Sequence, residues 1–220
     1  IEEEIEKWLS HILNEPINII GAGRTDKGVH AYGQVFHFDT KKKIDNLRHL
    51  LYALNRLLPP DIKIQTLRKV DENFHARFSA KKKEYIYKIY TGVNRPFYVN
   101  SHYVINFPLD IKLLKKASKY FVGQHNFQNL TSKEIDDKNF VRTIYSINVK
   151  QMGDEIIIRL VGNGFMRYMV RDVVGEMVEC ALKRQELTDL KRLFKGPRKI
   201  TNHKAPAQGL YLKKVYYDKN

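Results

Sequence analysis

Hydrophobic residues in the first part of the chain recur at two spacings, one helical and one strand-like. Segment 1–13 carries apolar side chains every three or four residues, which is the spacing of one helix face. A second segment with this spacing covers 44–58 and ends at Pro59-Pro60, because proline cannot continue a helix. Short apolar or alternating runs predict strands at 17–20, 35–38, 62–69 and 84–91.

The second part of the chain repeats this alternation of helices and strands. Asp110 is placed to cap a helix whose apolar face carries Ile111, Leu114 and Phe121. A turn with Gly153-Asp154 then separates two alternating runs, which predicts a hairpin of strands 141–150 and 155–161. The remaining predicted elements are a long helix, a shorter helix and a final strand, at 165–184, 188–195 and 210–217.

Interleaved short helices and strands with hairpins predict an α+β fold whose sheets are mainly antiparallel. We expect two ferredoxin-like (RRM-like) halves, each a sheet flanked by helices. Glycine and proline make segment 92–109 the weakest part of the pattern, so the predicted domains are 1–100 and 101–220. The first half shows no strand before its first helix, and we expect its opening strand to be missing from this chain.

The chain is strongly basic, which narrows its possible partners. It has 39 Lys and Arg residues against 24 Asp and Glu, a net charge of +15 and a pI near 9.7. A field of this sign attracts polyanions, so we expect an RNA-binding cleft between the two halves. A lysine-rich, solvated surface would give the same charge balance. An anionic membrane surface is a third alternative, but the chain lacks a strongly basic amphipathic helix.

Other features exclude several classes of protein. No segment approaches the roughly 18 apolar residues that a membrane-spanning helix needs. Cys180 is the only cysteine, which excludes an intramolecular disulfide and a cysteine-rich zinc site. The acidic first ten residues lack the basic region and apolar run of a secretory signal. We therefore expect a cytoplasmic protein with no membrane partner.

The glycine-rich segment GAGRTDKG, residues 21–28, resembles a phosphate-binding loop but fails both standard tests. Gly23 and Gly28 have Walker A spacing, yet Val29-His30 stand where the lysine and hydroxyl residue are required. A dinucleotide fingerprint needs a third glycine two residues earlier and a following helix, whereas a strand follows here. What distinguishes the segment is Asp26 between two basic residues in a flexible turn, because nearby cations favour an ionised carboxylate. A tight turn closed by the aspartate side chain would use the same residues.

Four segments in order resemble the motifs of the tRNA pseudouridine synthase A family. The first is GAGRTDKGVHAYGQVFHFDT at 21–40, and the second is FHARFSAKKKEYIYKIY at 74–90. The third is VGNGFMRYMVRDVVG at 161–175, and the fourth is APAQGLYL at 205–212. Together they span nearly the whole chain. One departure is that the family's opening strand, with its Tyr-Asp-Gly segment, does not occur in this sequence.

The resemblance implies an isomerase that converts uridine in tRNA to pseudouridine. In such enzymes the N1–C1′ bond breaks and the base rejoins the sugar through C5, at positions 38 to 40 of the anticodon arm. Asp26 matches the catalytic aspartate, which acts either as a nucleophile or as a base that removes a sugar proton. The reaction needs no cofactor and no metal, and the sequence offers no metal-binding cluster.

The resemblance also assigns two partners to Asp26. Tyr85 matches the active-site tyrosine, whose ring stacks on the extruded uracil and whose phenol can relay the C5 proton. Arg171 matches the basic residue that pairs with the catalytic aspartate. An arginine on a largely apolar helix needs such a partner, and its neighbour Asp172 does not face it. An arginine that reaches out to water is the alternative interpretation.

The remaining predicted site residues concern RNA binding. Arg24 matches the arginine that fills the space left by the flipped base, and Lys27 lies beside it on the same loop. Leu210 is expected to form an apolar wall beside the base. The basic run Lys81, Lys82 and Lys83 precedes Tyr85 and suits phosphate contact, although a solvated loop would look the same. The family implies a homodimer that binds the anticodon stem-loop of tRNA. The alternative function is a non-catalytic RNA-binding protein on the same scaffold.

Overall fold

Two separate hydrophobic cores organise the chain, whose computed structural model describes residues 1–132, 139–197 and 199–218. Unit 1 consists of residues 1–23 and 35–80, and unit 2 takes residues 24–34 together with the chain from residue 81 onward. The chain therefore enters unit 2 twice, the first time through a short excursion that carries Asp26. The domain division at residue 100 stays a prediction.

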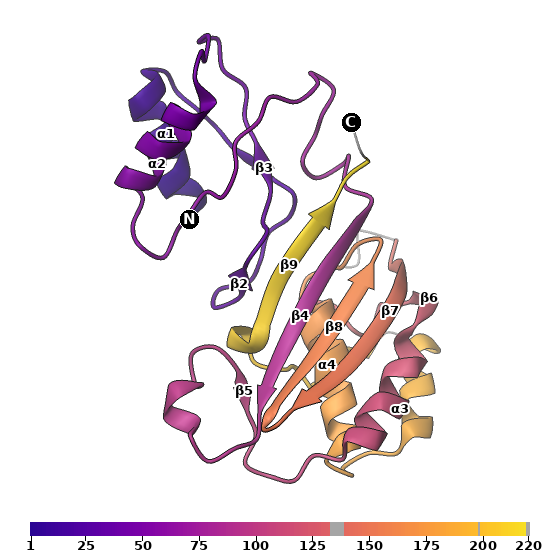
Figure 1. Cartoon of the computed structure of the whole chain (residues 1–220). Coiled ribbons are helices and arrows are strands. Elements are labelled where there is room, and N and C mark those ends of the chain that lie inside the picture. The colour runs from indigo at the N-terminus through magenta and orange to yellow at the C-terminus, as the bar shows by residue number, and fades with distance from the viewer. Residues whose placement is uncertain (133–138, 198, 219–220) are drawn as a thin grey trace. The chain divides into compact units, whose positions relative to one another are not determined.

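Unit 1 is built on two amphipathic helices, α1 (Glu2–Leu13) and α2 (Leu47–Leu57), as the hydrophobic spacing predicts (Figure 1). The Asn46 side chain caps α2 by accepting a hydrogen bond from the His49 N–H at 2.9 Å, which satisfies a free donor of the first turn. Two short strands, β1 (Ile20–Gly21) and β3 (Phe36–His37), pair antiparallel. Both strands are shorter than those predicted at 17–20 and 35–38.

The strand predicted at 62–69 is wrong, because this segment pairs with no neighbouring strand among the described residues. Its alternating apolar side chains instead pack against the core of unit 1. The Asn55 side chain takes the place of a partner strand. It accepts a hydrogen bond from the Ile64 N–H at 2.8 Å and donates one to the Ile64 carbonyl at 2.9 Å. The alternation of apolar and polar residues in this segment therefore reflects packing against the core and not hydrogen bonding to a neighbouring strand.

Unit 2 is organised by a sheet with strand order β2-β9-β4-β8-β7-β6, in which β5 also pairs with β4. The β2–β9 and β4–β5 pairs are parallel, and all other pairs are antiparallel. This confirms the predicted α+β fold with a mainly antiparallel sheet, while the description as two ferredoxin-like halves stays a prediction. The strand bounds are β2 (His30–Ala31), β4 (Lys82–Tyr90), β5 (Tyr103–Val104), β6 (Gly123–Asn126), β7 (Val141–Met152), β8 (Glu155–Gly162) and β9 (Leu210–Tyr216).

The helices α3 (Ile111–Phe121) and α4 (Met169–Ala181) of unit 2 cover one face of its sheet (Figure 1). Asp110 caps α3 as predicted, by accepting a hydrogen bond from the Leu113 N–H at 3.0 Å. The predicted hairpin is also confirmed, with β7 and β8 joined through Gly153, whose φ of 59° suits glycine.

Two helix predictions need correction. The helix predicted at 165–184 begins only at Met169, because Tyr168 has a left-handed backbone conformation with a φ of 66°. The helix predicted at 188–195 is the 3₁₀ helix η2 (Leu187–Phe194). Two shorter 3₁₀ turns are η1 (Arg95–Phe97) and η3 (Ala207–Gly209). Among the described residues, no helix is both long and apolar enough to span a membrane.

Candidate active site

Asp26 lies on a tight turn that leads into the edge of the unit 2 sheet. The Val29 N–H donates to the Asp26 carbonyl at 3.0 Å, and Gly28 has a φ of 85° at the turn's third position. A β-turn of this kind requires positive φ at that position, which glycine adopts without strain. His30, two residues after Gly28, is the first residue of β2 and pairs with Tyr211 of β9. The turn is thereby closed by its own hydrogen bond and held at its C-terminal end by the sheet.

Arg171, in the first turn of α4, forms an ion pair with Asp26. Its Nη1 donates to the Asp26 Oδ2 at 3.1 Å, with the two side chains 14% and 21% exposed. Its Nε donates to the Ala205 carbonyl at 2.7 Å, and the Ala205 N–H donates back to the Arg171 carbonyl at 3.1 Å. Two bonds from one rigid guanidinium fix its plane, so the carboxylate is held in one orientation. The pairing that the family resemblance implied is therefore present.

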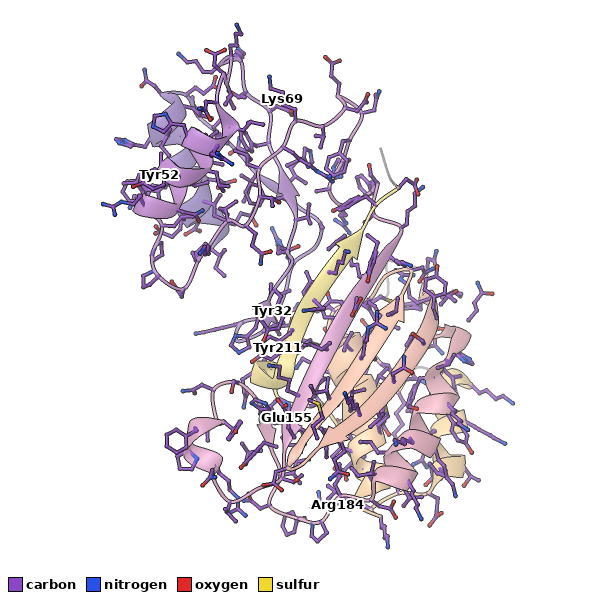
Figure 2. The ribbon with its side chains drawn as sticks, in the orientation of Figure 1. Tyr32, Tyr52, Lys69, Glu155, Arg184 and Tyr211 are labelled. Atoms are coloured by element: carbon purple, nitrogen blue, oxygen red, sulfur yellow. The ribbon has the colours of Figure 1, made fainter. Side chains whose placement is uncertain are left out.

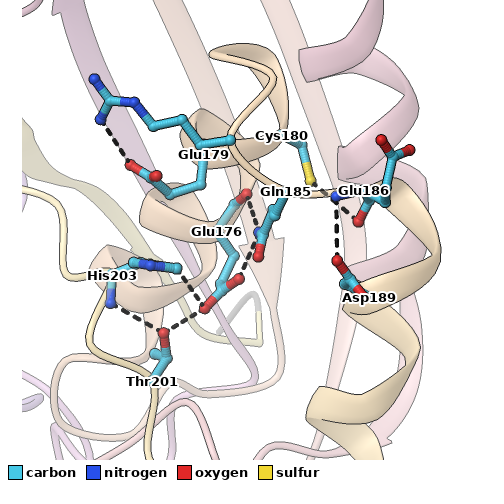
Figure 3. Close-up of polar contacts among 9 residues, drawn as sticks. Glu176, Glu179, Cys180, Gln185, Glu186, Asp189, Thr201 and His203 are labelled. Atoms are coloured by element: carbon cyan, nitrogen blue, oxygen red, sulfur yellow. Dashed lines mark hydrogen bonds and ion pairs between the residues drawn. The ribbon is translucent and has the colours of Figure 1, made fainter.

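The segment that carries Ala205 is itself bound to α4 by a buried network around Glu176 (Figure 3). The Glu176 carboxylate accepts hydrogen bonds from the Thr201 hydroxyl and from the Gln185 amide, the latter at 2.6 Å. It also lies 3.3 Å from His203 Nδ1. Gly175 allows this close packing, since a Cβ there would stand 1.8 Å from the His203 carbonyl oxygen. Sequence reasoning missed these residues, although a glycine beside a glutamate on a largely apolar helix was a visible signal.

Tyr85 is placed by β4 with its ring against the core of unit 2. It makes an edge-to-face contact with Phe165, with centroids 5.2 Å apart and an interplanar angle of 83°. Burial raises the pKa of the Tyr85 phenol to about 12, and the negative charge of Asp26 contributes to the rise. The phenol therefore keeps its proton at neutral pH and can donate it. Two residues on, the Tyr87 hydroxyl donates to the Pro206 carbonyl at 2.6 Å, which binds β4 to the segment of Ala205.

Tyr168 brings three cations together at the start of α4, a feature that sequence reasoning also missed. Its ring centroid lies 3.7 Å from Lys204 Nζ and 4.8 and 5.3 Å from the guanidinium carbons of Arg167 and Arg171. Cations are attracted to the face of an aromatic ring, so the ring gathers positive charge next to the Asp26 pair. A left-handed conformation is costly for a bulky residue, and such strain is concentrated at functional sites.

The predicted RNA-contacting residues have different surroundings. Arg24 and Lys27 are exposed on the loop of Asp26. Lys81 pairs with Asp218 at 3.0 Å, and Lys82 Nζ lies 4.7 Å from the Tyr216 ring centroid. Lys83 is half-buried at the start of β4.

Leu210, the proposed apolar wall, belongs to the core of unit 2 and is 5% exposed, so its contact with a base stays a prediction. In the part of the chain that the structure describes, no cluster of His, Cys, Asp or Glu could hold a metal ion.

Asp172 is an acid buried without a hydrogen-bond partner. It is fully buried, and neither carboxylate oxygen bonds to any described residue. Burial raises the pKa of its carboxyl to about 7. Lys204 and Arg171 oppose this rise, while Glu176 and Asp26 add to it. Asp172 therefore binds a proton more tightly in the folded chain than in the unfolded one.

Asp172→Asn is expected to change how the stability of the protein depends on pH. Because the pKa of Asp172 is raised in the folded state, its protonation adds to the free energy of unfolding. This stabilisation is fully present below about pH 4 and is lost as the pH rises through about 7. The loss amounts to at most about 4 kcal/mol by pH 8. The amide cannot ionise, so the difference in unfolding free energy between variant and wild type should shift in the variant's favour from pH 4 to pH 8. Urea unfolding at several pH values measures this. A constant difference would contradict the assignment.

Comparison with known proteins places this geometry in context. A family model described as tRNA pseudouridine synthase matches residues 1–79 and 117–218. A tRNA pseudouridine synthase A of Dictyoglomus thermophilum is 43% identical over 220 residues, covering 99% of this chain and 89% of the relative. Proteins of the same name from Anoxybacillus flavithermus and Bacillus licheniformis are 42% and 39% identical. They match 99% of this chain and 89% and 90% of their own lengths.

Proposed function

Because the chain belongs to the tRNA pseudouridine synthase family, we propose that it isomerises uridines at positions 38 to 40 of the tRNA anticodon arm, with Asp26 as the catalytic residue. The chain is an isomerase that modifies tRNA. The observation that carries the assignment of Asp26 is its ion pair with Arg171, at 3.1 Å between Nη1 and Oδ2. A carboxylate held in one orientation by a cation is suited to attack or to proton abstraction.

The proposed reaction uses three side chains of unit 2. Arg171 binds Oδ2 of Asp26 and leaves Oδ1 to act on the substrate. The carboxylate either attacks the sugar or base or removes a sugar proton, and the N1–C1′ bond breaks. The base then turns and forms the C1′–C5 bond, which releases Asp26 from the sugar or base or, in the other version, goes with return of the abstracted proton to the sugar. C5 then loses its proton and N1 gains one. The ring of Tyr85 stacks on the uracil, and its phenol relays this proton.

The proposed RNA contacts come from the basic residues around this site. Arg24 fills the position that the flipped uridine leaves in the stack, and Lys27 contacts a neighbouring phosphate. Lys81, Lys82 and Lys83 bind the backbone beside the strand of Tyr85. Leu210 offers an apolar edge to the base. We further propose a cytoplasmic homodimer, with tRNA contacting both subunits.

Tritium release from tRNA labelled at C5 of uridine tests this function, because isomerisation exchanges the C5 proton with solvent. Release should occur, and mapping of the product should place pseudouridine at one or more of positions 38 to 40. Product at other positions would contradict the anticodon-arm assignment. Tight tRNA binding without release would favour the alternative, a non-catalytic RNA-binding protein.

Tyr85→Phe separates the two roles of the tyrosine. The variant keeps the ring that stacks on uracil, so tRNA affinity should stay within about twofold of wild type. Loss of the phenol removes the proton relay, and tritium release should slow by about a hundredfold. Tyr145→Phe is the matched control, because it removes the phenol of an exposed tyrosine on β7 that the proposed reaction does not use. Unchanged release by Tyr85→Phe would exclude the phenol from proton transfer.

A further inference from the structure

Three aromatic rings stack on one another where β2 meets β9 in unit 2. The rings of His30 and Tyr211 have centroids 4.5 Å apart and an interplanar angle of 16°. The rings of Tyr32 and Tyr211, labelled in Figure 2, are 5.1 Å apart at 14°. Tyr211 in the middle is 6% exposed, whereas Tyr32 at the end of the stack is 42% exposed. The stack therefore ends in an aromatic ring that is partly exposed to solvent.

The backbone and hydrogen bonds hold this stack in place. The Tyr32 N–H donates to the Leu212 carbonyl at 2.9 Å, and the Tyr211 hydroxyl donates to the Ser101 carbonyl at 2.9 Å. His30 Nε2 lies 3.1 Å from the Asn100 carbonyl oxygen. Gly33 lets the chain after Tyr32 lie against β9, since a Cβ there would stand 2.6 Å from a backbone oxygen of that strand. A ligand that stacks on Tyr32 would thus meet a largely preformed surface.

Two lysines border the exposed end of the stack. Lys88 Nζ lies 4.6 Å from the Tyr211 ring centroid and donates to the Tyr32 hydroxyl at 3.1 Å. Lys213 Nζ lies 5.0 Å from the Tyr32 ring centroid. Aromatic faces next to cations bind single-stranded nucleic acid, because bases stack on the rings while the cations bind phosphates.

We infer that the aromatic stack, defined as His30, Tyr32, Tyr211, Lys88 and Lys213, is a second RNA-contact site that holds an unpaired base on Tyr32. The inference rests on the proposed function in that tRNA is the substrate. None of these residues takes part in the proposed chemistry at Asp26, Tyr85 and Arg171.

The sequence distance between Tyr32 and Asp26 limits which nucleotide can stack there. Tyr32 follows Asp26 by six positions, so their Cα atoms lie at most about 20 Å apart. A base bound on Tyr32 therefore lies in the same region of the bound RNA as the uridine at Asp26. RNA suits this surface better than an apolar protein partner does, because Lys88 and Lys213 place two cations beside the Tyr32 ring.

The test compares Tyr32→Ala with Tyr32→Phe, using a fluorescent RNA hairpin with the anticodon-arm sequence of a substrate tRNA. Tyr32→Ala should weaken binding about tenfold, and Tyr32→Phe should bind like wild type, because stacking needs only the ring. Hairpins with one abasic nucleotide at each loop position then identify the base. The hairpin that lacks the base stacked on Tyr32 should bind wild type and Tyr32→Ala with equal affinity, because neither protein can then form the stacking contact. Thermal unfolding confirms that Tyr32→Ala is folded, as expected for a half-exposed side chain.

The lysine contribution is measured by salt dependence. Lys213→Gln should reduce the slope of log affinity against log salt by about one. Lys116→Gln is the matched control, since Lys116 is an exposed lysine on α3. Equal affinity of wild type and Tyr32→Ala for every hairpin would overturn the inference. A change in oligomeric state of Tyr32→Ala with unchanged RNA affinity would also overturn it, in favour of contact with a second copy of the chain.

A failure of the proposed RNA-contact site can be distinguished from a failure of the proposed isomerase function. Tritium release by the wild-type protein is measured on the same preparation. A wild type that releases no tritium but binds RNA through Tyr32 would refute the proposed function and support this site. An active wild type whose RNA affinity does not depend on Tyr32 would refute only the site.

Discussion

Asp26→Asn is expected to abolish tritium release from every tRNA while leaving tRNA binding intact. The amide is the same size as the carboxylate, and the turn is closed by the Asp26 backbone carbonyl, so the local fold should persist. What is lost is the anionic oxygen that each version of the mechanism uses as nucleophile or base. Removal of such a group lowers turnover by a factor of about ten thousand or more.

The measurement is paired, with tRNA affinity and tritium release determined on the same purified variant. Affinity should stay near the wild-type value, because phosphate contacts depend on arginine and lysine. Asp39→Asn serves as the matched control, since it changes a carboxylate of unit 1 outside the proposed site. Residual turnover within about tenfold of wild type, roughly 1.4 kcal/mol of barrier, would show that another group carries the chemistry.

Secondary structure with a strong local cause could be predicted from the sequence. Asp110 caps α3 because a short acceptor followed by an apolar helix face is a local signal. The β7–β8 hairpin follows from alternation and a glycine turn in the same way. The segment at 62–69 has the same alternation but forms no strand, because pairing depends on a neighbour that the pattern does not encode. Asn55 supplies those hydrogen bonds instead.

The candidate active site could be predicted from the sequence only in part. Asp26 and Arg171 are 145 residues apart, so their contact could be expected from a family resemblance and not from spacing. The Ala205 carbonyl that orients Arg171 is a backbone group, and any residue type could provide it. The position of Tyr168 could not be predicted, because the apolar spacing places the start of the helix at residue 165. In the structure the helix starts four residues later, at Met169, directly after the left-handed Tyr168. A local sequence pattern indicates only the helix or strand to which a residue belongs. The Asp26–Arg171 pair, the Ala205 contact and the position of Tyr168 depend instead on how different elements pack together.

Arg171→Ala is expected to lower tritium release by at least about a hundredfold, because a catalytic group displaced by about 1 Å loses that much rate. The guanidinium bonds Asp26 and Ala205 at once, and alanine reaches neither. Arg171→Lys should also be impaired, since a single ammonium lacks the planar fork that reaches both partners. Affinity for tRNA should fall far less than turnover does, because the arginine acts through the orientation of Asp26. Thermal unfolding establishes that both variants are folded.

Added guanidinium gives this prediction its sharpest test. The Arg171 side chain is 14% exposed, so its removal leaves a space beside Asp26 that a free guanidinium ion can occupy. Millimolar guanidinium should restore part of the activity of Arg171→Ala, whereas sodium at the same ionic strength should not, which controls for salt effects on RNA binding. Arg184→Ala is the matched control, since Arg184 forms an exposed pair with Glu179 at 3.5 Å, and such pairs contribute little. Near-normal turnover of Arg171→Ala, or an equal loss in Arg184→Ala, would show that the ion pair with Asp26 does not position the carboxylate for catalysis.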